Sequence, residues 1–240
     1  MRIVHTESSR AIGGQEMRVI EEMEWFQRHG HEVALAAADE SGIATLARER
    51  GLTLFPVRFR GSFNPRTISR LLRACRDHRT QLIVTHSSRD TFASWPVARM
   101  LRIPLLRYQH ICIRQRDGVL HRFAWRLAPE RIVAVSRSIK DRLIKQKLAP
   151  AEKIEVIGEY VDLSSFHPDV APGDLRTRHH IPSDATVIMQ IGMIRPDKGQ
   201  QVLVRAVDEI LQWHPSCRFV FVGSATEPRY LEDLQAEVRA

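Results

Sequence analysis

Short apolar runs alternate with amphipathic segments along nearly the whole chain, and this alternation limits the fold more than any other feature. The apolar runs are four to six residues long, as buried strands are. Strands that alternate with helices about every 20–30 residues form parallel, doubly wound sheets. We therefore expect an α/β, Rossmann-like fold with strands at 2–6, 32–37, 52–57, 82–85, 104–109, 131–135, 154–157, 186–191 and 218–222.

The segments between these runs have the 3.6-residue period of helices that bury one face. Gly30 follows the first segment as a C-terminal stop, and Ser136 is a candidate N-cap. The expected helices are 15–29, 43–50, 65–78, 92–101, 137–145, 199–214 and 228–239.

Residues 167–183 differ from the rest because they carry prolines, a glycine and charge without periodicity. Such a stretch is typical of an interdomain linker. We expect an N-terminal domain over 1–166, this linker, and the start of a second Rossmann-like domain over 184–240. Because two strands and two helices would leave an apolar sheet edge unpaired, we expect either that this second domain is incomplete or that something else covers the edge.

Charge and cysteine content narrow the function classes. The 240 residues carry a net charge of +8, which favours anionic partners such as phosphorylated ligands or acidic membrane surfaces. No helix-turn-helix, RRM or KH signature accompanies this charge, so we expect no nucleic-acid partner. The three cysteines are scattered without zinc spacing, which predicts a reduced, cytoplasmic location and no structural metal.

Two glycines, Gly13 and Gly14, follow the first strand and precede a helix, with Glu16 just behind them. Without Cβ atoms they would let a ligand approach the backbone at a helix N-terminus. A tight turn explains the same pair equally well.

Two histidines follow neighbouring expected strands, His86 after 82–85 and His110 after 104–109. The carboxyl ends of parallel strands are where such sheets bind ligands. A histidine there can donate to a sugar hydroxyl or stabilise developing charge, although a structural role is the alternative.

The stretch 186–199 combines a buried strand, a loop with Arg195 and Lys198, and a helix that opens at Gly199. Two cations beside a helix N-terminus suit an anion such as a diphosphate. An ordinary strand-to-helix connection with solvated cations is the alternative.

The helix at 65–78 carries a dense series of arginines beside an apolar face, among them Arg66, Arg70 and Arg73. Such a helix can lie on an anionic membrane surface. Alternatively, its apolar face packs on the sheet and the arginines are solvated.

Taken together, five stretches resemble glycosyltransferase family 4: GGQE with RHGHEV, AVSRSIKDRLI, KIEVIGEYVDLSSFHP, IGMIRPDKGQQVLVRA and FVFVGS. They occur in the family's order over residues 1 to about 235. The opening MRIVHTESSRAIGGQE is most similar to bacterial enzymes of lipopolysaccharide or other surface-polysaccharide synthesis. The resemblance implies the two-domain GT-B fold.

The family moves a sugar from a nucleotide-diphosphate donor to an acceptor hydroxyl with retention at the anomeric carbon and without an obligatory metal or cofactor. By resemblance, Gly13 and Gly14 line the cleft near the diphosphate, and His110 matches the histidine near the donor sugar. Lys198 matches the lysine that neutralises the leaving diphosphate. The implied partners are a nucleotide sugar, a lipid-linked or saccharide acceptor and the anionic inner-membrane surface.

The sequence departs from the family pattern in two places. Met193 stands where the family has an arginine, and Arg195 follows two residues later as a candidate replacement. The family's pair of donor-binding glutamates would lie beyond Ala240. We therefore expect little or no transferase activity from this chain alone, and robust sugar transfer by it would contradict that expectation. The rival functions are a nucleotide-sugar 2-epimerase on the same scaffold and a non-catalytic, truncated acceptor- or membrane-binding module.

Overall fold

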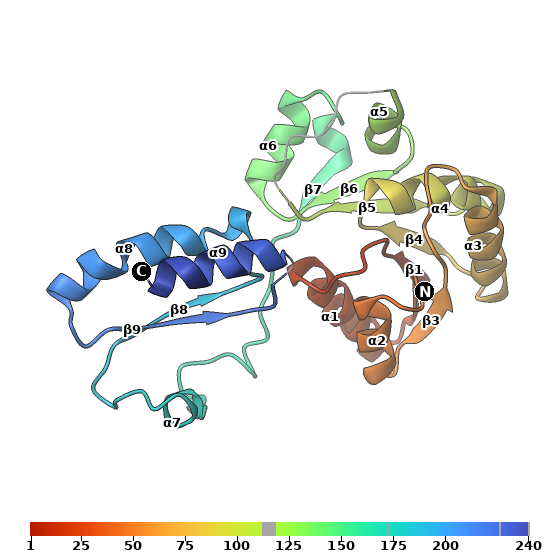
Figure 1. Ribbon diagram of the computed structural model, residues 1–240. Helices are drawn as coiled ribbons and strands as arrows, with labels where there is room; N and C mark the ends of the chain where they lie inside the picture. The colour runs from red at the N-terminus through yellow and green to blue at the C-terminus, as the bar shows by residue number, and fades with distance from the viewer. Residues whose placement is uncertain (112–118, 172, 226, 240) are drawn as a thin grey trace. The chain divides into compact units, whose positions relative to one another are not determined.

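The computed structural model describes residues 1–111, 119–171, 173–225 and 227–239 (Figure 1). It forms two compact units, Met1–Val161 and Asp162–Ala240. The stretch expected as a linker, 167–183, contains the short helix α7 (Leu175–Arg178).

A seven-stranded sheet is the centre of the first unit, and every neighbouring pair of its strands is parallel. The strand order is β3-β2-β1-β4-β5-β6-β7, so the chain builds outwards in one direction and then returns to build in the other. The change of direction falls between β1 and β4. The strands are β1 (Arg2–Thr6), β2 (Glu32–Ala37), β3 (Thr53–Pro56), β4 (Leu82–Thr85), β5 (Leu105–Gln109), β6 (Arg131–Ala134) and β7 (Ile154–Val156).

Alternation along the central strands divides the core between the two faces of the sheet. Ile3 packs with the apolar faces of α1 and α2, whereas the next residue, Val4, packs with α3 and α4. Successive strand side chains point to opposite faces, so a strand covered on both faces reads as a continuous apolar run. The helices of this unit are α1 (Gly14–Arg28), α2 (Gly42–Glu49), α3 (Pro65–Asp77), α4 (Ser88–Leu101), α5 (Val119–Arg126) and α6 (Arg137–Lys145).

Helix α4 begins at Ser88, four residues earlier than the apolar pattern predicts. Ser87 and Asp90 form a capping box: Asp90 N–H donates to Ser87 Oγ at 3.4 Å, and Ser87 N–H donates to Asp90 Oδ1 at 2.8 Å. This reciprocal cap satisfies N–H groups that the first turn leaves unpaired. The predicted cap of α6 is confirmed, because Ile139 N–H donates to Ser136 Oγ at 3.3 Å.

Helix α5 was not expected, because residues 114–131 carry many arginines and read as a basic stretch. Trp125 of this helix is nevertheless fully buried, in a third core cluster with α6, β6 and β7. The guanidinium of Arg107 lies 3.6 Å from the centroid of the Trp125 ring. The part of the basic stretch at 114–118 lies outside the described residues.

The second unit contains a parallel pair of strands, β8 (Val187–Ile191) and β9 (Arg218–Val222), with helices α8 (Gln200–Trp213) and α9 (Pro228–Arg239). The two strands approach most closely where they end. A Cβ atom on Gly223 would lie 1.9 Å from the carbonyl oxygen of Gly192, so only glycine fits there.

Candidate functional site

The carboxyl edge of the first sheet gathers the candidate ligand-binding residues. β1 and β4 are neighbours at the point where the strand order reverses. Crevices at such switch points bind ligands in open α/β sheets. Glu7 follows β1, His86 follows β4 and His110 follows β5, so the topology brings both predicted histidines to this edge.

Three histidines form a continuous row below and at this edge. Nδ1 of His5, a fully buried residue of β1, lies 3.2 Å from Nε2 of His86. Nδ1 of His86 in turn lies 3.0 Å from Nε2 of His110. Among the described residues, neither His5 Nε2 nor His110 Nδ1 has a hydrogen-bond partner. The row therefore has two unpartnered ends, and one of them is the predicted catalytic residue.

The contacts between the rings couple their tautomers. A neutral imidazole has one N–H donor and one acceptor nitrogen. If His5 Nδ1 donates to His86, then His86 Nδ1 donates to His110, and the free Nδ1 of His110 carries a proton. In the opposite arrangement, that nitrogen is a bare acceptor.

Burial keeps the row uncharged at neutral pH. Removal from water lowers the pKa of His5 to about 3 and the pKa of His110 to about 4. The pKa of His86 also lies well below its ordinary value, through burial first and then through its two neighbouring histidines. His110 can therefore act as a hydrogen-bonding group rather than as a fixed cation.

A second network supports His110 from the side of α1, and its members were not predicted. Tyr108 stacks on the His110 ring with centroids 5.6 Å apart, and its hydroxyl donates to Glu22 Oε1 at 2.5 Å. Burial raises the pKa of Glu22. The guanidinium of Arg18 lies 5.5 Å from the Tyr108 centroid.

Arg18 ties this network to the end of the first unit. Its Nη1 donates to Glu159 Oε2 at 2.6 Å and to the carbonyl of Gly158 at 3.1 Å. Arg18 is only 4% exposed, and its charge helps to lower the pKa of His110 after burial, the larger cause. The carboxylate of Glu159 is thus paired with Arg18.

The glycine pair lies at the N-terminus of α1, as expected. Gly13 is extended (φ −149°), and its N–H donates to Glu16 Oε2 at 2.8 Å. Glu16 is buried, and its carboxylate satisfies the backbone N–H of Gly13 at the start of the helix. A Cβ on Gly14 would meet no atom within 4 Å, so space is open there.

Glu7 lies between the glycine loop and the end of β1, and no role was predicted for it. Its carboxylate accepts from Ser9 N–H at 2.7 Å and from Gln15 Nε2 at 2.6 Å. Burial, with a smaller effect of nearby Asp90, raises the pKa of Glu7 to about 7. Its position directly after a buried strand was the signal available in the sequence.

The predicted diphosphate loop lies in the second unit, between β8 and α8. Arg195 Nε forms an ion pair with Asp197 Oδ1 at 2.7 Å. Lys198 is exposed, and its ammonium has no acidic partner within the described parts of the chain. Gly199 adopts φ +75° and gives α8 an N-terminus without a side-chain cap. An exposed cation thus lies directly beside a helix N-terminus that has no side-chain cap.

The arginines Arg66, Arg70 and Arg73 lie on the exposed face of α3. The apolar face of that helix is used by the core, because Leu71 and Cys75 are fully buried and Ile68 packs against the same cluster. Any membrane contact of α3 would therefore depend on its arginines. Arg70 and Arg73 also line a groove of about 730 Å³ beside β3.

Among the described residues, no three His, Cys, Asp or Glu side chains are placed to hold a metal ion. None of the helices within the described ranges is both long and apolar enough to cross a membrane.

Known proteins share parts of this sequence. The model of Glycosyltransferase Family 4 matches residues 12–165. A D-inositol 3-phosphate glycosyltransferase of Kineococcus radiotolerans is 35% identical over 88 residues, 37% of this chain and 20% of that protein. The protein of the same name from Thermobifida fusca is 27% identical over 150 residues, 57% of this chain and 34% of its own length. The matched part of the chain thus spans 20% and 34% of the length of these two relatives.

Solved structures share the fold over nearly the whole chain. A glycosyltransferase from Rickettsia africae has a TM-score of 0.84 at 17% identity, with 99% of this chain and 64% of that one covered. Anabaena HepE in complex with UDP and glucose has a TM-score of 0.82 at 19% identity, with 100% and 66% covered. The predicted α/β fold of GT-B type is thereby confirmed.

Proposed function

The chain belongs to glycosyltransferase family 4, and on this premise we propose that its protein is a retaining, nucleotide-sugar-dependent glycosyltransferase in which residues 1–166 form the acceptor side. The reaction moves a sugar from a nucleotide diphosphate to a hydroxyl of a lipid-linked or saccharide acceptor in bacterial envelope synthesis. The observation that carries the proposal is the buried histidine row, which ends with the unpartnered Nδ1 of His110 at the carboxyl edge of the sheet.

The donor in this proposal is a nucleotide-diphosphate sugar. Anabaena HepE was solved with UDP-glucose, which supports a donor of that class. Lys198, Arg195 and the uncapped N-terminus of α8 would neutralise the diphosphate as it leaves. Since Arg195 is paired with Asp197, the greater part of this role falls to Lys198. These groups would neutralise the diphosphate without an obligatory metal.

His110 would hydrogen-bond the transferred sugar as a neutral group, with Gly13 and Gly14 giving the ligand close access to the backbone. The acceptor would enter along the same edge, near His86 and Glu16. We place the protein in the cytoplasm, at the inner membrane that holds lipid-linked acceptors.

The test is sugar transfer by the protein expressed from its complete gene. With UDP-glucose and bacterial lipid-linked saccharide, UDP release should depend on the acceptor, and NMR should show retention at the anomeric carbon. Losing one charge-stabilising contact typically costs about 3–4 kcal/mol in the transition state, so Lys198→Ala should lower kcat about 100- to 1,000-fold. Lys145→Ala removes an exposed lysine of α6 and is the matched control.

Epimer formation from the nucleotide sugar without any acceptor would instead establish the 2-epimerase. Two structures on related scaffolds, Staphylococcus aureus MnaA with UDP and a putative UDP-N-acetylglucosamine 2-epimerase from Listeria monocytogenes, have TM-scores of 0.66 and 0.64. Failure of both reactions would leave the binding module as the function.

A further inference from the structure

A cavity of about 570 Å³ opens at the carboxyl ends of β1, β2 and β4, beyond the loop that follows β3. Its volume lies within the range of about 300–1,000 Å³ of small-molecule sites. Four arginines line it, together with Glu7 and short loop residues. The four are Arg10, Arg58, Arg60 and Arg89.

Two of the arginines are placed by alternation in the chain that leaves β3. Val57 and Phe59 are buried in the core, so Arg58 and Arg60 project away from it. The hydroxyl of Thr67 on α3 donates to the carbonyl of Arg58 at 2.8 Å and fixes this backbone. The arginines are therefore carried by an anchored segment.

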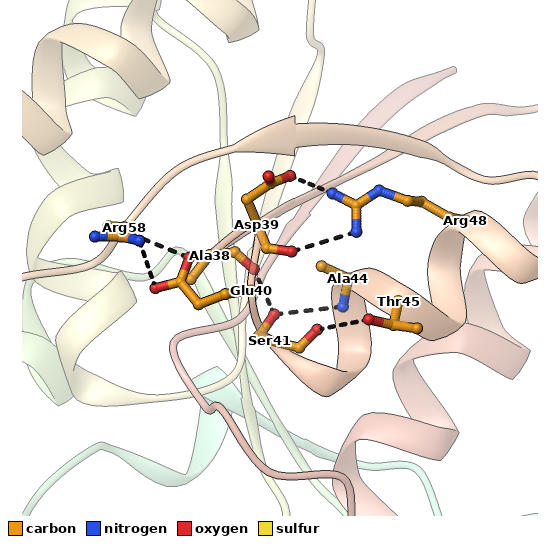
Figure 2. Close-up of polar contacts among 8 residues, drawn as sticks. All are labelled: Ala38, Asp39, Glu40, Ser41, Ala44, Thr45, Arg48 and Arg58. Carbon is orange, nitrogen blue, oxygen red and sulfur yellow. Dashed lines mark hydrogen bonds and ion pairs between the residues drawn. The ribbon is translucent and has the colours of Figure 1, made fainter.

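The other charges of the cavity are unequally paired. Figure 2 shows Glu40, on the turn after β2, contacting Arg58, with Nη2 and Oε1 2.9 Å apart. Arg10 reaches the same Glu40 oxygen at 3.5 Å. Hydrogen bonds around Ser41 and the pair of Asp39 with Arg48 hold this turn in place (Figure 2).

Arg60 and Arg89 have no acidic partner within the described ranges of the chain. Arg89 also lies in the first turn of α4, where the helix dipole disfavours a cation. The cavity thus has four arginines in its lining against one lining carboxylate, Glu7, and Glu40 pairs with only two of the four, so positive charge is in excess. A bound anion would neutralise the excess positive charge and offset the unfavourable effect of the helix dipole on Arg89.

We propose that this arginine cavity binds a phosphomonoester group of the acceptor, held by Arg60 and Arg89. Guanidinium groups present forked N–H donors that match phosphate oxygens, and two unpaired cations match the charge of a phosphate dianion. The inference rests on the proposed function, because it assigns the charged end of the substrate whose hydroxyl receives the sugar.

The test is calorimetric titration of the 240-residue chain with glucose 6-phosphate at low salt and pH 7.5. Glucose 6-phosphate should bind, and glucose should not. Arg60→Gln/Arg89→Gln should weaken binding at least tenfold. The matched control, Arg76→Gln/Arg99→Gln, removes two exposed arginines of α3 and α4 outside the cavity and should change binding less than twofold. Circular dichroism checks that each variant is folded.

Several results would overturn the proposal. These are no binding of glucose 6-phosphate, equal weakening by both double variants, or equally tight binding of glucuronate, whose anion is a carboxylate. Displacement of glucose 6-phosphate by UDP would assign the cavity to the donor and not to the acceptor. Sugar transfer is assayed separately, so phosphate binding without any transfer would contradict the proposed function alone.

Discussion

Nε2 of His110 lies 3.0 Å from Nδ1 of His86, and both rings are closed off from water on most sides. Burial should keep His110 neutral until the pH falls to about 4. His86→Ala removes a ring that shields His110 and admits water to it, so the pKa of His110 should rise towards 6.5. NMR titration of the imidazole Cε1 protons measures this shift. His179→Ala, at an exposed position of the second unit, should leave the curve unchanged, and a wild-type midpoint near 6.5 would refute the burial argument.

Glu7→Gln should change the dependence of stability on pH. The pKa of Glu7 rises from 4.5 in the unfolded chain to about 7 in the folded one. Its stabilising contribution is therefore complete below pH 4.5 and is lost as the pH rises through 7, by about 3 kcal/mol. Because glutamine does not titrate, the free energy of unfolding of the variant relative to wild type should rise by about 3 kcal/mol between pH 4.5 and 8.5. Urea unfolding at both pH values measures it, and an equal difference at both would contradict the prediction.

Gly223→Ala should destabilise the second unit, because the new methyl group would overlap the carbonyl oxygen of Gly192. Overpacking of this kind costs about 1–3 kcal/mol or more. In the same unit, Gly173→Ala adds a methyl group that meets no atom within 4 Å and is the control. Thermal unfolding followed by circular dichroism compares the two, and equal melting temperatures would show that β8 and β9 separate at little cost.

The membrane hypothesis for α3 predicts that the chain floats with anionic vesicles at low salt and not with neutral ones. Replacement of Arg66, Arg70 and Arg73 by glutamine should abolish flotation, since each cation near such a surface contributes about 1 kcal/mol. Replacement of Arg126, Arg131 and Arg137, which are exposed elsewhere on the same unit, is the control. If the variant without Arg66, Arg70 and Arg73 still floats with the vesicles, α3 is not the element that binds the membrane.

Local patterns predicted the strands and most helices because each apolar run and each amphipathic period is contained within a few residues. The position of His86 and His110 at one edge followed from strand order. His5 was missed because it reads as part of an apolar strand, although it completes the row. Tyr108 and Glu22 meet across 86 residues of sequence, and no local pattern encodes such a contact.

Composition led to a wrong prediction at residues 114–131. Because of its arginines this stretch was not predicted to contain α5, whose buried residue Trp125 lies against the guanidinium of Arg107. Likewise, the carboxylate of Glu16 is engaged at the helix end, a local use that the pattern GGQE does not distinguish from ligand contact.

Each imidazole in the row passes a single hydrogen bond to the next, so the row has only two settings, and both ends change together. A hydrogen-bond acceptor placed against Nδ1 of His110 selects the setting in which Nε2 of His5, beneath the sheet edge, carries no proton. Whether His110 donates or accepts at Nδ1 is thus decided jointly with a fully buried residue of β1. Sequence changes around His5 can therefore invert the hydrogen-bonding character of His110 while His110 itself stays the same.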